Sequence, residues 1–145
     1  MVSMVLPAQV HDQIVAIARA ALPFEACGYV VGDVAGTDRI VVAGVHPIEN
    51  ALRSPVAFAL DGQSMIDTEA RIVDLDQEIV GVFHSHPTSA PVPSRRDLDD
   101  AARYDPVGHY LHVIVSMQGF APRVRAWTYA GEVANELTIT AADRS

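Results

Sequence analysis

The sequence has no lysine and only one cysteine, and these two shortages exclude several kinds of chemistry. All 10 basic residues of the 145-residue chain are arginines. Without a lysine amine, Schiff-base catalysis and a P-loop are excluded. With Cys27 as its only cysteine, the chain can form no internal disulfide and no multi-cysteine zinc site. Any metal site must therefore use histidine and carboxylate side chains.

Positive charge is also scarce, and it is not clustered. The 10 arginines against 18 acidic residues give a formal net charge of -8, and no four basic residues occur in a row. The chain thus lacks a surface that neutralises phosphates, which argues against nucleic acid or an anionic membrane as a partner. No apolar segment reaches about 18 residues, and the first residues lack the basic region of a signal peptide. We therefore expect no membrane span and a cytoplasmic protein.

The chain does have enough apolar sequence for a sizeable core. Half of its residues are hydrophobic and 19% are charged, so we expect residues 1–145 to fold as a single domain. Apolar residues at helical spacing predict a helix over residues 8–22, which Pro23 ends. A second helix is expected after the capping residue Asp61, and a short polar helix over residues 94–104.

The remaining apolar runs predict strands, so the chain belongs to the α/β class. Runs rich in β-branched and aromatic residues, separated by glycine, proline and aspartate, occur over residues 27–32, 39–48, 56–60, 78–86, 110–117, 121–129 and 136–140. The turn residues between the first two runs indicate a hairpin-like connection. At least two of the last three are expected to be antiparallel neighbours.

Two histidines and an aspartate form the pattern that carries chemistry. His84 and His86 are two residues apart at the end of a predicted strand, so both imidazoles point to the same side of the sheet. If a helix starts at Ser94, Asp97 lies in its first turn and faces back toward the strand end. Two imidazoles and a carboxylate suit zinc, and three protein ligands leave a fourth position for water, as in catalytic sites.

A site that activates water also needs a general base outside the ligand set. Glu25 is one of six glutamates, it follows the helix-ending Pro23, and it immediately precedes an apolar run. An unpaired charge is costly in that position. Glu25 is therefore the candidate base.

Each of these features also has a plain structural interpretation. Strand histidines often satisfy backbone groups or face solvent. Ser94 and Asp97 match the S-x-x-D capping box, which satisfies a helix N-terminus without any metal. Cys27, at the start of an apolar strand, is interpreted as a small buried side chain, and His109 and His112 as structural residues. What favours a functional site is the conjunction of H-S-H-P, S-x-x-D and an upstream P-x-E-x-C-G.

These motifs resemble those of the JAMM or MPN-plus metallopeptidases, also called the Mov34/MPN/PAD-1 family, over nearly the whole chain. The family pattern is an upstream glutamate, then H-[ST]-H-P, then a serine three positions before an aspartate; it is filled here by Glu25, His84, Ser85, His86, Pro87, Ser94 and Asp97. The resemblance implies that one zinc ion is bound by His84, His86 and Asp97. It further implies that Glu25 is the acid/base for the activated water and that Ser94 hydrogen-bonds the oxyanion. The implied fold is cytidine-deaminase-like, with a curved mixed β-sheet flanked by helices.

Three segments, P-F-E-A-C-G-Y-V-V-G, N-A-L-R-S-P and P-S-R-R-D, are similar to the small bacterial branch of the family that acts on ubiquitin-like sulfur-carrier proteins. This implies a substrate with a Gly-Gly tail that lies extended in a groove. It also implies hydrolysis of the amide after the terminal glycine, which releases cysteine in sulfur assimilation. Arg53 or Arg95 is a candidate to hold the carboxylate of that cysteine. The alternative is that Arg53 is a surface loop residue and Arg95 an ordinary helical position.

Other functions compete with this one. A general isopeptidase would remove ubiquitin-like modifiers from lysine, and the choice between lysine and cysteine conjugates stays open at this point, as do the carrier protein and the oligomeric state. A non-catalytic MPN-type scaffold module is one rival, but the ligand set of such modules is typically broken, and here it is intact. Another rival is a site that binds metal for structure only, in a chain that serves as a binding platform for a ubiquitin-fold partner; metal content alone does not separate this alternative from catalysis. A zinc nucleobase deaminase shares the implied fold, yet its H-x-E and P-C-x-x-C motifs need more cysteines than the chain has.

Overall fold

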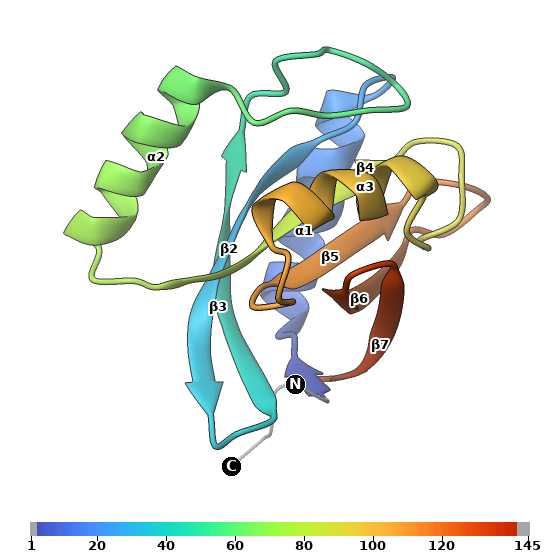
Figure 1. Cartoon of the computed structure of the whole chain (residues 1–145). Coiled ribbons are helices and arrows are strands. Elements are labelled where there is room, and N and C mark those ends of the chain that lie inside the picture. The colour runs from blue at the N-terminus through green and yellow to red at the C-terminus, as the bar shows by residue number, and fades with distance from the viewer. Residues whose placement is uncertain (1–2, 142–145) are drawn as a thin grey trace.

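The computed structural model of the protein describes residues 3–141, which form seven strands and three helices (Figure 1). In chain order these are β1 Ser3–Val5, α1 Ala8–Ala21, β2 Cys27–Ala35, β3 Arg39–Ile48, α2 Gly62–Asp74, β4 Ile79–His86, α3 Arg95–Tyr104, β5 Leu111–Ser116, β6 Arg123–Ala130 and β7 Val133–Thr140. The three predicted helices and six of the seven predicted strands are confirmed. No helix within residues 3–141 is both long and apolar enough to cross a membrane.

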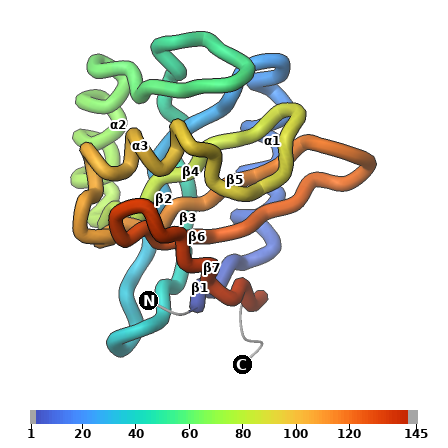
Figure 2. Tube along the Cα trace, turned by 45° about the vertical axis from the view of Figure 1, so that its right-hand side comes forward, coloured from blue at the N-terminus to red at the C-terminus, as the bar shows by residue number. Residues whose placement is uncertain are grey.

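The strands form one mixed sheet that curves until it closes. Their order is β1-β3-β2-β4-β5-β6-β7, and β1 closes the barrel because it pairs in parallel with both β3 and β7. Figure 2 shows β1 beside β7 at one end of the molecule. The central pair β4–β5 is also parallel, whereas the remaining neighbours are antiparallel. The predicted α/β fold with a curved mixed sheet is confirmed.

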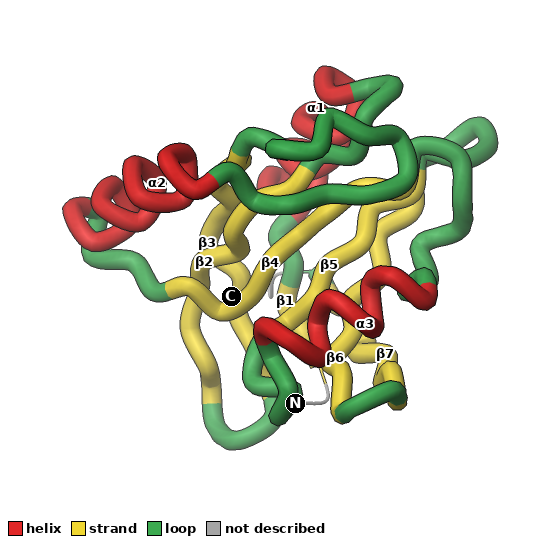
Figure 3. The backbone as a smooth tube through the Cα atoms, turned by 45° about the horizontal axis from the view of Figure 1, so that its top comes forward, coloured by secondary structure: helices red, strands yellow, loops and turns green. Residues whose placement is uncertain are grey.

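Helices cover both faces of the central strands, with α1 and α3 on opposite sides (Figure 3). On β5, Val113 and Val115 pack into the core that contains the apolar face of α1, whereas Ile114 packs toward α3. Strands buried on both faces carry nearly continuous apolar sequence rather than a polar alternation. This explains why the middle of β5, residues 113–115, is continuously apolar.

Two of the three helices, α2 and α3, begin where a side-chain cap satisfies a backbone N–H group of the first turn. Asp61 accepts a hydrogen bond from the Ser64 N–H (2.9 Å) at the start of α2, as predicted. Ser94 accepts one from the Asp97 N–H (3.0 Å) at the start of α3. These caps fix the first residue of each helix relative to the preceding loop.

The strand predicted over residues 56–60 is wrong. In this segment only Leu60 forms a β-bridge, with Asn50. The Asn50 side chain takes the place of a partner strand: its Oδ1 accepts the N–H groups of Leu52 (3.0 Å) and Ala59 (3.2 Å), and its Nδ2 donates to the Ala57 carbonyl (3.1 Å). The alternation of V-A-F-A-L imitates a strand, but its backbone is satisfied within a closed loop.

The close pairing of β4 with β5 depends on the absence of a side chain at Gly81. A Cβ there would collide with the carbonyl oxygen of Leu111 and lie 2.7 Å from the Leu111 Cβ. We expect Gly81→Ala to lower the free energy of unfolding by about 1–3 kcal/mol, because these strands would have to separate. Gly62→Ala is the control, since it lies at the start of α2 with open space around its Cβ. Urea denaturation of both variants tests this expectation, which equal stabilities would contradict.

Candidate metal centre

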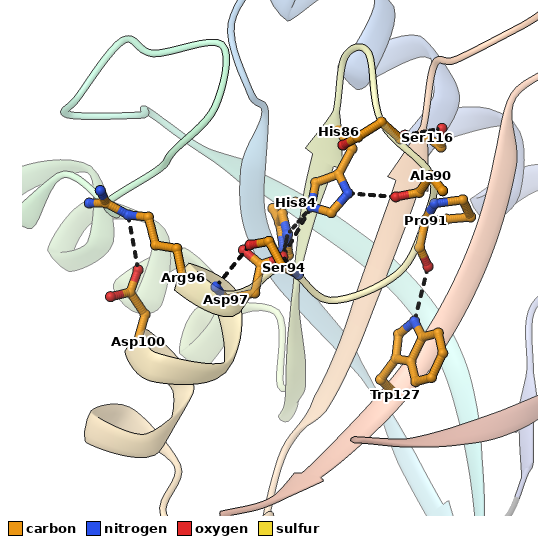
Figure 4. A network of polar contacts seen from close by, with 11 residues as sticks. His84, His86, Ala90, Pro91, Ser94, Arg96, Asp97, Asp100, Ser116 and Trp127 are labelled. Carbon is orange, nitrogen blue, oxygen red and sulfur yellow. Dashed lines mark hydrogen bonds and ion pairs between the residues drawn. The ribbon is translucent and has the colours of Figure 1, made fainter. Parts of the chain in front are cut away.

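The end of β4 presents two histidines to the side of the sheet covered by α3 (Figure 4). Ser85, which lies between the two histidines, points to the opposite face of the sheet. Phe83 points to that face as well and packs into the core beside α1. Both imidazoles are buried: His84 is 2% exposed and His86 4%. The predicted alternation is therefore present.

Asp97 reaches the two histidines from the first turn of α3. Its Oδ2 lies 3.2 Å from His84 Nε2 and 3.0 Å from His86 Nε2. The same oxygen accepts the Ser94 N–H (2.9 Å), so Ser94 and Asp97 form a complete capping box. The capping interpretation and the metal-ligand interpretation are therefore compatible, because the cap holds the carboxylate where it meets the histidines.

The three side chains provide a donor set and spacing that fit zinc. His84 Nε2 and His86 Nε2 are 3.1 Å apart, so with Asp97 Oδ2 they form a nearly equilateral triangle. Ligand atoms around a tetrahedral zinc ion, with bonds of about 2.0–2.1 Å, are separated by about 3.3 Å. Two imidazole nitrogens and a carboxylate oxygen this close together require a shared cation or proton between them.

A hydrogen bond on the far side of His86 fixes the tautomer that leaves Nε2 available. The Nδ1–H of His86 donates to the Ala90 carbonyl (2.7 Å), which leaves a lone pair on Nε2. The loop that carries Ala90 is held in turn by the Trp127 indole N–H, which donates to the Pro91 carbonyl (3.2 Å; Figure 4). Ala90 and Trp127 were not predicted, because their hydrogen bonds with His86 and Pro91 follow no local sequence pattern.

The charges of the cluster are strongly coupled. Burial alone would raise the pKa of Asp97, but hydrogen bonds from His84 and His86 hold it far below its usual range. Burial alone would lower the pKa of His86, but its hydrogen bonds with Asp97 and the Ala90 carbonyl raise it. The cluster is thus arranged as an anion facing a site for positive charge.

Glu25 lies opposite His86 because β2 and β4 are paired. Cys27 is the register partner of His84, and continuing the antiparallel register places Ala26 opposite Ser85. There the Ala26 N–H donates to Ser85 Oγ (2.7 Å), and the Ser85 N–H donates to the Ala26 carbonyl (3.0 Å). The register therefore carries Glu25, one residue further, toward the metal-ligand cluster.

The Glu25 carboxylate is buried without a full set of partners. The residue is 5% exposed, and its Oε1 has no hydrogen-bond partner among residues 3–141. Burial raises the pKa of Glu25 to about 7, with His86 lowering it and Asp97 raising it. A buried carboxylate with an unpartnered oxygen beside a candidate metal centre is suited to exchanging a proton.

The two arginines proposed for substrate binding lie in different surroundings. Arg53 is in the loop after β3, with its guanidinium 5.9 Å from the Phe24 ring centroid, and the carbonyl of the adjacent Ser54 accepts the Glu25 N–H (2.8 Å). Arg95 is held by two carboxylates instead, Asp99 (3.2 Å) and Glu132 (2.8 Å). The structure thus brings the Arg53 segment next to Glu25 and engages Arg95 on the surface.

Phe58 and Asn50 belong to the site and were not predicted. The Phe58 ring stacks on His84, with centroids 4.6 Å apart and planes at 23°. Asn50 Nδ2 donates to the Glu25 carbonyl (3.0 Å), so the side chain that closes the loop also fixes the candidate base. Neither residue has a local signature, although both lie in or near the N-A-L-R-S-P segment that resembles the family.

Cys27 is an inert buried side chain, as interpreted from the sequence. It is 1% exposed, and its thiol donates a hydrogen bond to the Ile48 carbonyl (3.4 Å). Burial raises the pKa of this thiol to about 12. A thiol this hard to ionise is a poor nucleophile.

Comparison with known proteins identifies relatives over most of the chain. The family described as prokaryotic homologues of the JAB domain matches residues 7–130. A desampylase of Haloferax volcanii is 32% identical over 139 residues, which cover 92% of this chain and 93% of that protein. A CysO-cysteine peptidase of Mycobacterium tuberculosis is 35% identical over 111 residues, covering 76% and 72% of the two chains.

Solved structures have the same fold. The solution structure of a protein from Desulfitobacterium hafniense matches with a TM-score of 0.83 and 28% identity, covering 99% of this chain and 94% of that one. A solution structure from Salinibacter ruber matches with a TM-score of 0.70 and 28% identity, covering 97% and 92%.

The Ser85 hydroxyl is expected to stabilise the fold, because it accepts the N–H of Ala26, the residue that follows Glu25. Ser85→Ala would leave the buried Ala26 N–H without its acceptor, and we expect a loss of roughly 1–3 kcal/mol in the free energy of unfolding. Ser89→Ala is the control, because Ser89 is exposed and no described contact of its hydroxyl would be lost. Thermal and urea unfolding of the two variants measure the difference. Equal stability would show that the Ala26–Ser85 hydrogen bond contributes nothing.

Proposed function

Because the chain belongs to the JAB-domain family, as one of its prokaryotic homologues, we propose that it is a zinc-dependent hydrolase of the JAMM type. Its proposed substrate is a ubiquitin-like sulfur-carrier protein, cleaved at the amide after the Gly-Gly tail, with release of cysteine in sulfur assimilation. The observation that carries the proposal is the convergence of His84, His86 and Asp97 beside the unpartnered carboxylate of Glu25. The relative named as a CysO-cysteine peptidase supports this choice of substrate.

The metal would be held by Nε2 of His84, Nε2 of His86 and the carboxylate of Asp97, whose ligand atoms all lie within 4.8 Å of one another. When bound, zinc supplies a Lewis acid that polarises the scissile carbonyl and makes water easier to deprotonate.

Glu25 would transfer the proton, and Ser94 would stabilise the developing negative charge. The Glu25 Oε1 has no hydrogen bond to lose among the described residues, so it can take a proton from the attacking water and give it to the leaving nitrogen. Ser94 Oγ already accepts the Asp97 N–H, which leaves its own O–H to donate to the oxyanion.

Of the two candidate arginines, we propose Arg53 for the carboxylate of the departing cysteine. Its guanidinium packs over Phe24, next to the candidate base, and no ion pair holds it within residues 3–141. Arg95 would first have to leave Asp99 and Glu132.

Lysine-linked conjugates are the second candidate substrate. The observation that favours them is the alignment with a desampylase over 92% of the chain, which is longer than the alignment with the CysO-cysteine peptidase. The single-domain organisation, the cytoplasmic location and the absence of nucleic-acid and membrane partners remain predictions.

Replacement of the candidate base separates metal binding from catalysis. We expect Glu25→Gln to retain one zinc ion per chain, and to lower turnover by about 10²- to 10⁴-fold because the proton acceptor is gone. His86→Ala should lose both the metal and the activity. Mass spectrometry of carrier–cysteine and carrier–lysine conjugates, with and without a chelator, measures turnover, and elemental analysis measures zinc. Loss of zinc in Glu25→Gln would make Glu25 a ligand, and cleavage of neither conjugate by the zinc-loaded wild type would favour the non-catalytic binding module.

Arg53 and Arg95 provide a matched pair for the leaving group. We expect Arg53→Ala to raise KM for a carrier–cysteine conjugate about tenfold, since a charged hydrogen bond is lost, without affecting a carrier–lysine conjugate, which has no carboxylate at that position. Arg95→Ala should leave KM for both conjugates within about twofold. A larger effect of Arg95→Ala, or an equal effect of Arg53→Ala on both conjugates, would contradict the assignment.

A further inference from the structure

A cavity of about 350 Å³ opens next to the metal centre, between α2, α3 and the sheet. His84 and Asp97 line one end of it, and Met65 and Glu69 of α2 line another part. Its wall is mostly apolar, with Phe58, Leu60, Ile79 and Val82 among the contributors. A substrate bound for cleavage at the metal centre would therefore have this cavity within reach.

The cavity is negatively charged. Among the described residues its lining includes the carboxylates of Glu69, Asp97, Asp100 and Asp105, and no arginine. Asp105 is already occupied, because it accepts the N–H groups of His109 and Tyr110 and pairs with the His112 ring. Asp97 faces the two histidines of the metal centre. Two carboxylates therefore remain for a ligand: Glu69, which is hydrogen-bonded to Tyr29, and Asp100, whose ion pair with Arg96 is long at 3.6 Å.

A buried hydroxyl in the same lining also lacks a partner. Tyr129 is 2% exposed, its ring stacks on His112, and its Oη has no hydrogen-bond partner among residues 3–141. Buried hydroxyls are rarely left without a partner, so each such group calls for a partner supplied from outside the chain. Tyr129 is independent of the carboxylates and also points to a ligand in this cavity.

We propose that this cavity binds a basic side chain of the carrier tail, located one or two residues before the Gly-Gly, with its alkyl part against the apolar wall and its charge at Glu69 and Asp100. The inference rests on the proposed function, which supplies a Gly-Gly tail. An extended chain advances about 3.3 Å per residue, so the first side chain before two glycines lies within about 10 Å of the scissile bond. Long basic side chains commonly bury their methylene groups and keep the charged end at a rim.

The same charges indicate which way the substrate lies. The carboxylate of a departing cysteine would be repelled by Glu69 and Asp100, and a conjugated lysine carries no charge on the nitrogen of its amide. Neither leaving group is complementary to the cavity. The tail therefore lies along α2 and α3, and the leaving group lies on the side of Arg53.

Binding of cleavage products tests the proposal without requiring catalysis. The probes are fluorescein-labelled peptides that end in Gly-Gly with a free carboxylate and carry Arg, Leu or Glu at the third or fourth position from the end. Fluorescence anisotropy with the zinc-loaded protein gives their affinities. We expect an Arg peptide to bind about tenfold more tightly than its Leu and Glu counterparts, the effect of a charge-assisted hydrogen bond.

The double substitution Glu69→Gln with Asp100→Asn should remove this preference. The matched control is Asp67→Asn with Asp74→Asn, which makes the same change in net charge at exposed positions of α2 outside the cavity. The control should retain the preference, because long-range attraction between exposed charges is screened by salt.

Three results would overturn the proposal: Leu peptides that bind as tightly as Arg peptides, a preference that survives the double substitution, or no binding of any peptide. Its failure is distinguishable from failure of the proposed function. Cleavage of full-length conjugates without an Arg preference would retain the function and reject the cavity assignment. An Arg preference that depends on Glu69 and Asp100, without cleavage of any conjugate, would retain the cavity assignment and reject the proposed function.

Discussion

The Asp97 carboxylate joins two parts of the molecule that are separate in the chain. Its Oδ2 accepts the Ser94 N–H at the start of α3 and lies within 3.2 Å of both imidazoles at the end of β4. The N-terminus of a helix stabilises negative charge, so α3 favours the ionised form that the histidines also require. The position of α3 on the sheet and the electrostatics of the centre therefore depend on the same atom, and the cavity between α2 and α3 depends on both.

The convergence of the three candidate ligand residues could be predicted from the sequence because short-range geometry decides where their side chains point. Strand alternation places His84 and His86 on one face, and the three-residue spacing of a capping box places Asp97 beside Ser94. Glu25 is different, since it reaches the cluster only through the pairing of β2 with β4. It could be suggested from the cost of burying a charge, but its location depends on long-range register.

Other features could not be predicted, because they arise from contacts between distant segments. β1 is only three residues long, so it carries no recognisable period, yet it closes the barrel between β3 and β7. The segment 56–60 has the alternation of a strand, but Asn50 satisfies its backbone. The cavity exists only after α2 and α3 pack against the sheet, so neither the unpartnered Tyr129 hydroxyl nor the hydrogen bonds of Asp105 could be predicted from a local pattern.

The closure of the segment 51–59 by one side chain has an evolutionary consequence. Asn50 binds both ends of the segment and also the Glu25 carbonyl, so the base of the loop is anchored independently of its length. Extra residues inserted beyond this anchor would extend over the surface and leave the candidate base and the candidate ligands in place, since lengthening a loop costs little free energy. Such a fold can change the surface around the candidate metal centre through insertions at one point, while the centre itself stays unchanged.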